Sequence, residues 1–294
     1  MNTLMDIIKG MLIGIANIIP GVSGGTMALS MGIYDKLIGA VSNLFKDFKK
    51  SVLTLLPILI GCAAGIICFT YIIQYLLTNH TYVTCMAFIG LILGGLPMLV
   101  RKLKENLEKK GSSIGISGVL SFVILFAISV ALPLFGSDEP ALTALTVSPG
   151  MMVSLFLIGI IASATMVIPG VSGSMVLMIL GYYYGILGSI KNFLEGLKAF
   201  DFAAMFHEAM LLVPFGIGVL LGIFLIAKLI TFLFERYGVQ TYCAILGLIL
   251  SSPFAIFYNT GLLSQLGGLN AMILISGVLA GLVCAAAAYF LGEK

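Results

Sequence analysis

Charged side chains are scarce in this sequence of 294 residues: only 9% are Asp, Glu, Lys or Arg, while 60% are hydrophobic. Soluble domains carry about 25% charged residues, so this chain cannot coat a water-facing surface of its size. Three runs hold no such charge at all, namely 51–100, 140–190 and 237–292. Each is long enough for two membrane crossings of about 20 residues apiece. These absences exclude soluble enzymes, nucleic-acid-binding proteins and disordered chains, and they predict an all-α polytopic membrane protein.

Residues that would build other kinds of site are also rare. The chain has no Trp, only two His, and five Cys that all lie in apolar stretches without a CxxC pair. We therefore expect packing roles for the cysteines and no metal site. The net charge of +3 comes without a basic tract, so no nucleic-acid partner is predicted. No cofactor is expected, and a coupling proton or cation and the oligomeric state stay open.

What the sequence does contain is an internal repeat. The hexapeptide Ile-Pro-Gly-Val-Ser-Gly occurs at residues 19–24 and again at 168–173. Further matches follow in the same order: Gly61 and Gly65 with Gly218 and Gly222, residues 90–93 with 247–250, and residues 116–120 with 275–279. Ordered matches of this kind indicate a duplicated unit. The predicted boundaries are 1–140 for the first membrane repeat and 141–294 for the second, within one integrated membrane domain.

Each repeat contains four apolar segments, of which the first is interrupted. They cover about residues 8–32, 52–77, 82–101 and 113–134, and then 151–181, 211–234, 240–257 and 271–291. The Pro-Gly pair falls inside the first segment of each repeat. Proline removes a backbone donor and clashes with the preceding turn, so we expect a broken helix at both places. Backbone groups freed at membrane depth need partners from protein or water.

The placement of Lys and Arg predicts how the broken segments lie in the membrane. If each is a re-entrant hairpin, every repeat has three crossings and the two repeats are inverted. All Lys and Arg residues except Lys191 and Lys198 then face the cytoplasm. If the broken segments span, the repeats are parallel, and Lys9, Lys228, Arg236 and Lys294 lie outside. Because cytoplasmic loops carry the excess of Lys and Arg, the inverted arrangement is favoured, although whether the broken segments fully span stays open.

The two breaks are the candidate substrate site. After Pro-Gly, a serine and further small residues precede a fresh apolar helix, and the first turn of a helix has unpaired N–H groups that attract phosphate or carboxylate. Inverted hairpins would bring two such ends near the bilayer midplane, as in transporters with discontinuous helices. The candidate residues are Asn17, Pro20, Gly21, Ser23, Gly24, Gly25 and Thr26 in the first repeat and Pro169, Gly170, Ser172, Gly173 and Ser174 in the second. Asn17 and Thr26 correspond to Met166 and Met175, so the two half-sites differ chemically.

The first motif also carries a family resemblance. The string Gly14-Ile-Ala-Asn-Ile-Ile-Pro-Gly-Val-Ser-Gly-Gly-Thr26, followed by Gly32-Ile-Tyr34, resembles the signature of the DUF368 family, and the second hexapeptide matches the repeated pattern of that family. The resemblance covers essentially the whole chain. It implies a polyprenyl-phosphate flippase, not an enzyme, that returns undecaprenyl phosphate from the outer to the cytoplasmic leaflet of the bacterial plasma membrane for cell-envelope synthesis. Its partners would be the lipid-linked phosphate and the bilayer.

The residues alone leave other interpretations of the function open. An anion channel or exchanger would use the same helix ends, whereas a lipid-modifying enzyme lacks support because no Asp, His or Glu cluster lies in the apolar segments. Arg236 is a further candidate: it either pairs with Glu235 at the interface or receives the phosphate on the inner side. Lys228 is expected to snorkel to the interface. Asp6, Lys9 and the run 101–110 are interpreted as loop charges.

Overall fold

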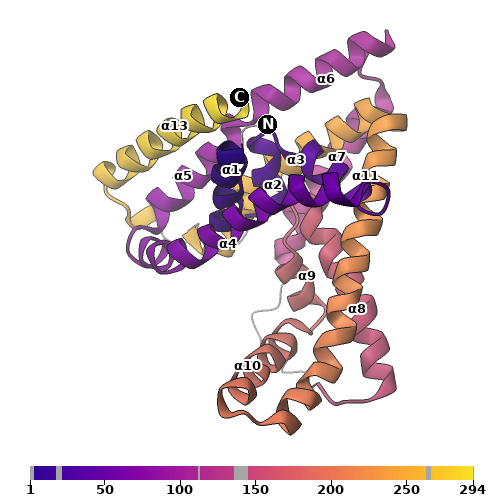
Figure 1. The fold of residues 1–294 in the computed structure, drawn as a ribbon. Helices are drawn as coiled ribbons and strands as arrows, with labels where there is room; N and C mark the ends of the chain where they lie inside the picture. The colour runs from indigo at the N-terminus through magenta and orange to yellow at the C-terminus, as the bar shows by residue number, and fades with distance from the viewer. Residues whose placement is uncertain (1–2, 18–21, 112, 136–144, 263–265, 294) are drawn as a thin grey trace. The chain divides into compact units, whose positions relative to one another are not determined.

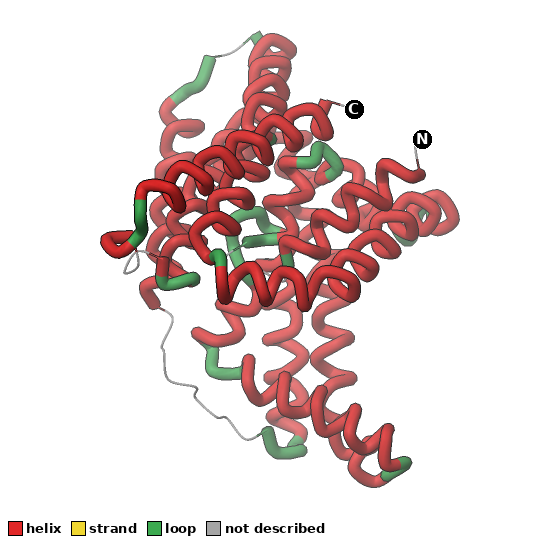
Figure 2. Tube along the Cα trace, turned by 90° about the vertical axis from the view of Figure 1, so that its left-hand side faces the viewer, coloured by secondary structure: helices red, strands yellow, loops and turns green. Residues whose placement is uncertain are grey.

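We describe a computed structural model of the chain, which covers residues 3–17, 22–111, 113–135, 145–262 and 266–293. Its described elements are helical throughout, as Figure 2 shows, which confirms the predicted all-α fold. Up to residue 135 they are α1 Thr3–Ala16, α2 Gly24–Ser30, α3 Tyr34–Ser42, α4 Phe48–Asn79, α5 Thr81–Gly94, α6 Leu96–Lys110, α7 Ile116–Ala131 and η1 Leu132–Phe135. From residue 149 they are α8 Pro149–Val167, α9 Gly173–Ile179, α10 Tyr183–Ala199, α11 Phe202–Asn259, η2 Leu266–Gly268 and α13 Ala271–Glu293 (Figure 1).

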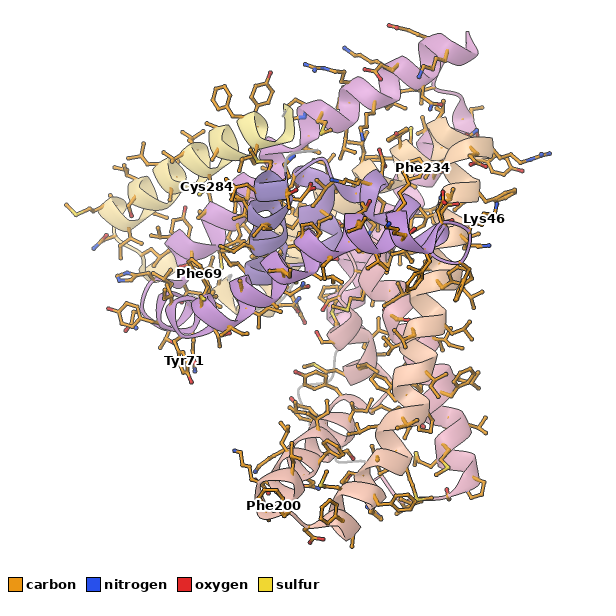
Figure 3. All side chains as sticks on the ribbon, in the orientation of Figure 1. Lys46, Phe69, Tyr71, Phe200, Phe234 and Cys284 are labelled. Atoms are coloured by element: carbon orange, nitrogen blue, oxygen red, sulfur yellow. The ribbon has the colours of Figure 1, made fainter. Side chains whose placement is uncertain are left out.

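Within the described ranges, six helices are long and apolar enough to cross a membrane, or up to seven if the bent pair α9–α10 is one span. One of the six is α11, whose 58 residues contain a kink at Tyr237 (φ −123°, ψ 40°). At 1.5 Å per residue, the helical stretches before and after the kink are about 52 Å and about 33 Å long, so each is long enough for one crossing of a hydrocarbon core of about 30 Å. Large apolar side chains such as Tyr71 on α4, which is 82% exposed, point away from the ribbon (Figure 3). The exterior of these helices therefore suits lipid, and the chain is a multi-pass membrane protein.

Both predicted helix breaks are present. α1 ends at Ala16 and α2 begins at Gly24, while α8 ends at Val167 and α9 begins at Gly173. Pro20 and Gly21 lie outside the described residues, so the geometry of the Pro-Gly turn is seen in the second repeat alone. The helices that follow the breaks are short, with seven residues each. The second of them turns by 110° into α10.

Helices also occupy stretches outside the eight predicted apolar segments. The charged run 101–110 belongs to α6, because Leu, Lys and Glu are strong helix formers. This helix ends at Gly111 in the left-handed conformation (φ +53°), a common helix stop. α10 contains Lys191 and Lys198, and its apolar residues recur at helical spacing. The loop interpretation of the run 101–110 was therefore wrong, and α3 is a further helix that follows α2 closely.

Contacts between residues divide the chain into two compact units. The larger unit comprises Met1–Pro133, Ile168–Val171 and Ala227–Lys294, and the smaller unit comprises Leu134–Val167 and Ser172–Ile226. In the smaller unit, Leu155, Ile186 and Leu211 form the buried core. In the larger unit, α2 is enclosed, with Met27 and Met31 fully buried. The division into repeats at residue 140 stays a prediction.

In the larger unit, α1 and α4 pack side by side through glycines and run in the same direction. A Cβ atom on Gly10 would lie 2.2 Å from the Ile58 carbonyl oxygen, and one on Gly14 would lie 2.1 Å from that of Cys62. The contact positions rise together by four residues in both helices, so the two helices are parallel. Only glycine permits this close an approach of two backbones.

The smaller unit repeats this arrangement between α8 and α11. A Cβ atom on Gly218 would lie 2.1 Å from the Phe156 carbonyl oxygen, and one on Gly222 would lie 2.5 Å from that of Ile160. Again the numbers rise together, so α8 runs parallel to the first half of α11. Gly218 and Gly222 are the repeat counterparts of Gly61 and Gly65, and Gly61 likewise meets a backbone oxygen of α1, that of Ile7, at 2.0 Å.

A second kind of glycine contact joins α5 to α13 in the larger unit. A Cβ atom on Gly90 would lie 2.0 Å from the Gly281 carbonyl oxygen, and one on Gly94 would lie 2.2 Å from that of Ala285. These helices are parallel and lie side by side in Figure 1. α5 belongs to the first predicted repeat and α13 to the second, so the contact links the two.

The reciprocal contact is made by α7 and the second half of α11, also within the larger unit. A Cβ atom on Gly247 would lie 2.4 Å from the Phe122 carbonyl oxygen, and one on Gly118 would lie 3.3 Å from Cys243 Sγ. Gly247 is the counterpart of Gly90 in the sequence alignment of the repeats. The third apolar segment of each repeat therefore packs in parallel against the fourth segment of the other.

Candidate functional site

The first motif presents the start of α2 to the break. Ser23 has an extended backbone (φ −94°, ψ 133°) and occupies the N-cap position, but its side chain makes no capping hydrogen bond. The first backbone bond of the helix runs from Met27 N to Ser23 O at 3.1 Å. The N–H groups of Gly24, Gly25 and Thr26 precede it in the first turn, where α-helices offer no internal acceptor. The break is therefore lined by backbone donors.

Ser23 adds an unsatisfied hydroxyl to these donors. The residue is 6% exposed, and within the described part of the chain its Oγ is buried without a hydrogen-bond partner. A buried polar group left unpaired costs about 1–3 kcal/mol, and nearly all such groups in native proteins find a partner. An acceptor or donor from a bound molecule would remove this cost.

Asn17 lies beside the same turn. A Cβ atom on Gly24 would come within 2.8 Å of Asn17 Oδ1 and 2.9 Å of Nδ2, so the amide lies against the backbone at the start of α2. Asn17 itself is exposed, and its polar end is therefore accessible at the break.

The second motif is more open at its helix start. Ser172 is the N-cap residue of α9 (φ −96°, ψ 119°), and Val176 N bonds to Ser172 O at 3.2 Å. Ser172 Oγ and Ser174 Oγ lie 2.9 Å apart, with Ser174 exposed. A Cβ atom on Gly173 would lie 2.9 Å from the Ala162 carbonyl oxygen. The predicted difference between the half-sites therefore extends to burial as well as residue type.

The turn of the second motif contacts the helix of the first. Gly170 adopts the left-handed conformation (φ +80°), and its N–H donates to Thr26 Oγ1 at 2.6 Å. Its carbonyl oxygen accepts from Ser129 Oγ on α7 at 3.0 Å. Ser251 Oγ on α11 lies 2.6 Å from Ser129 Oγ. The sequence analysis identifies neither Ser129 nor Ser251 as a candidate site residue, because an isolated serine in an apolar helix gives no local signal.

Asp6 and Lys9, two charged residues near the first motif, are buried on a helix and do not lie in a loop. Asp6 and Lys9 are each 5% exposed on α1, and Lys36 Nζ on α3 lies 2.6 Å from Asp6 Oδ2. Lys9 interacts electrostatically with both groups. The loop interpretation was wrong because α1 already begins at Thr3 and α3 supplies a counter-ion. The repeat counterparts of Asp6 and Lys9 are Leu155 and Ile158, so this buried charge is found in one repeat alone.

The remaining candidate, Arg236, is exposed in α11 directly before the kink at Tyr237. Among the described residues no group of three His, Cys, Asp or Glu side chains is placed to hold a metal ion. The arrangement offers backbone N–H groups, hydroxyls and an amide at two helix breaks. Donors of these kinds are able to bind an acceptor-rich group, for which helix N-termini are suited.

The fold is that of a polytopic helical membrane protein with two helix breaks, and some transporters hold an anionic substrate at discontinuous helices. The chain belongs to the VCA0040-like family, described as undecaprenyl phosphate translocase-like, whose sequence profile matches residues 13–267. This confirms the family resemblance that the motifs indicate.

Two relatives share most of their length with this chain. A polyprenyl-phosphate transporter from Staphylococcus aureus (strain NCTC 8325 / PS 47) is 29% identical over 256 residues, covering 86% of each chain. A polyprenyl-phosphate transporter from Vibrio cholerae serotype O1 (strain ATCC 39315 / El Tor Inaba N16961) is 27% identical over 266 residues, covering 86% of this chain and 77% of the relative. No solved structure matches the chain at a significant level.

Proposed function

We propose that this protein is a flippase that moves polyprenyl phosphate, specifically undecaprenyl phosphate, from the outer to the cytoplasmic leaflet of the bacterial plasma membrane. Each of the two Pro-Gly-Val-Ser-Gly motifs offers a site for the lipid phosphate, one at the first turn of α2 and one at the first turn of α9. The substrate is supported by the family and its named relatives, and the direction is what the DUF368 resemblance implies. The phosphate site rests on the geometry of the first break.

The observation that carries the site is the buried, unpaired hydroxyl of Ser23 beside the N–H groups of Gly24 and Gly25. A phosphate monoester accepts several hydrogen bonds, so it would satisfy the hydroxyl and the backbone donors together. Exposure of an ion to the hydrocarbon core costs at least about 2.5–3.5 kcal/mol even on lenient scales. Donors that replace the water of the phosphate lower this cost while the prenyl tail stays in lipid.

We infer that the broken segments are re-entrant and the repeats inverted, and the helix directions support this. If segment 8–32 spanned the membrane, α1 and α4 would be consecutive crossings and would run antiparallel, yet Gly10 and Gly14 meet α4 in parallel register. In parallel repeats the third and fourth segments would run in opposite directions. The parallel contacts of α5 with α13 and of α7 with α11 therefore support inversion, in agreement with the Lys and Arg distribution.

This topology predicts which faces accept an impermeant thiol reagent. Ser113→Cys, before α7, is expected to face the cytoplasm, while Ala199→Cys and Gly268→Cys are expected to face outside. All three positions are exposed, and the measurement uses whole cells in a background without the five native cysteines. Labelling of 113 from outside would reverse the orientation, and protection of both 199 and 268 would favour spanning segments and parallel repeats.

Transport in liposomes tests the function itself. Purified protein is expected to move a fluorescent prenyl phosphate between leaflets, measured as loss of protection from an impermeant quencher. Protein-free liposomes serve as the control, and there the prenyl phosphate is expected to stay in its leaflet because its charge opposes crossing, whereas a prenyl alcohol with the same tail is expected to cross equally fast with and without the protein. Flux of chloride or inorganic phosphate without lipid movement would instead indicate the anion channel or exchanger, and a modified lipid product would indicate an enzyme.

A further inference from the structure

In the Pro169–Gly170 turn, both backbone groups of Gly170 form hydrogen bonds with side chains of distant helices. The Gly170 N–H donates to Thr26 on α2, and the Gly170 carbonyl oxygen accepts from Ser129 on α7. A Cβ atom at this position would lie 2.6 Å from the Leu248 carbonyl oxygen on α11. Three helices therefore fix a turn that lies 144 positions along the chain from Thr26.

The hydroxyls of this network are buried, and each of them takes part in at least one hydrogen bond. Thr26 and Ser251 are 0% exposed and Ser129 is 2% exposed. Ser129 donates to Gly170, which leaves its oxygen free to accept from Ser251 at 2.6 Å; Ser251 also lies 2.6 Å from the Leu248 carbonyl oxygen. Hydroxyls are costly in an apolar interior unless they are hydrogen-bonded, and a fully connected network rigidifies the groups it holds.

We propose that Ser129 and Ser251 are positioning residues for substrate binding: through Gly170 and Thr26 they fix α2 so that its first turn meets the phosphate. This inference rests on the proposed phosphate site. Thr26 Oγ1 accepts the Gly170 N–H and thereby acts on α2, while the backbone N–H groups of the same turn remain directed at the break. Hydrogen bonds to a bound group weaken steeply when donors are misplaced, so a small shift of α2 lowers phosphate affinity.

The test compares the affinity of detergent-purified protein for undecaprenyl phosphate and for undecaprenol, which has the same tail without the phosphate. Ser129→Ala and Thr26→Val each remove one bond to Gly170, and Val keeps the shape of Thr. Each is expected to reduce the phosphate-over-alcohol ratio about tenfold, equivalent to about 1.4 kcal/mol. Thr26→Ser keeps the acceptor and is expected to preserve the ratio.

Ser252→Ala is the matched control. Ser252 is 2% exposed on α11, next to Ser251, and its hydroxyl bonds to Leu248 O at 3.2 Å without contacting Gly170. The phosphate-over-alcohol affinity ratio of the Ser252→Ala protein is expected to stay within twofold of the wild-type ratio. The double variant Thr26→Val with Ser129→Ala is expected to lose less than the sum of the two single losses, because both act on one turn.

Two outcomes overturn the inference. One is an unchanged ratio in Ser129→Ala and Thr26→Val. The other is an equal loss of affinity for both lipids, which indicates a general structural role. A wild-type protein with no preference for the phosphate contradicts the proposed function instead, so the two failures are distinguishable. Melting temperatures of the same samples identify a variant that is unfolded, and in that case the Thr26→Ser and Thr26→Val pair decides the result.

Discussion

Replacing Gly170 with valine is expected to reduce leaflet exchange of prenyl phosphate to the level of empty liposomes. The position has φ +80°, which is a strained conformation for a β-branched residue. The new Cβ would also lie 2.6 Å from the Leu248 carbonyl oxygen and 2.9 Å from Leu248 Cβ. The carbonyl belongs to the backbone of α11 and has little freedom to withdraw, so the turn itself has to move and both of its side-chain bonds are lost.

Two other glycine variants serve as controls for Gly170→Val. Gly24→Ala brings a Cβ against the Asn17 amide, the end of an exposed side chain that can rotate away, so partial transport is expected. Gly188→Val on α10 meets nothing within 4 Å and is expected to transport almost normally. Wild-type transport by a folded Gly170→Val protein would show that the turn does not matter for the site.

A single methyl group at Gly218 is expected to destabilise the protein, whereas the same change two residues earlier is expected to stabilise it slightly. A Cβ on Gly218 would lie 2.1 Å from the Phe156 carbonyl oxygen, while one on Gly216 would meet nothing within 4 Å. Overpacking typically costs about 1–3 kcal/mol. In an open helical position, Ala is favoured over Gly by about 1 kcal/mol.

Thermal melts of the purified Gly218→Ala and Gly216→Ala variants check this pair. Both changes add one methyl to the same stretch of α11, so differences in expression and detergent affect them alike. The expected order of melting temperatures, from highest to lowest, is Gly216→Ala, wild type, Gly218→Ala. Equal melting temperatures for the two variants would mean that α8 and α11 do not approach each other through Gly218.

The sequence predicts those features that have a local chemical cause. The Pro169–Gly170 pair combines a residue that removes a backbone donor with one of low helix preference, so the sequence predicts the break between α8 and α9, whereas Pro57 alone lies inside the continuous α4. The glycines of the packing contacts are also visible in advance, because Gly61 and Gly218 align between the repeats. What alignment does not give is the partner of each glycine, since that depends on which helix lies beside it.

The features that sequence reasoning misses depend on contacts between distant segments. Ser129 and Ser251 lie in apolar helices with no neighbouring pattern, and their role comes from the approach of α7, α11 and the second motif. Asp6 and Lys9 occur where a chain often leaves the membrane, and only the position of Lys36 on α3 makes their burial tolerable. Pairing of this kind follows from tertiary structure and has no signature in the local sequence.

The exchange of helix partners between the repeats sets an order on the synthesis of the protein. α5 ends at Gly94, but its glycine face packs against α13, which begins at Ala271 and follows every other described helix. At about 5–20 residues per second, a ribosome needs on the order of ten to thirty seconds to make the intervening chain. During that interval the glycine face of α5 has only lipid or transient neighbours beside it. The first repeat is thus completed by the second, and a nascent chain that stalls before α13 keeps an open seam along α5.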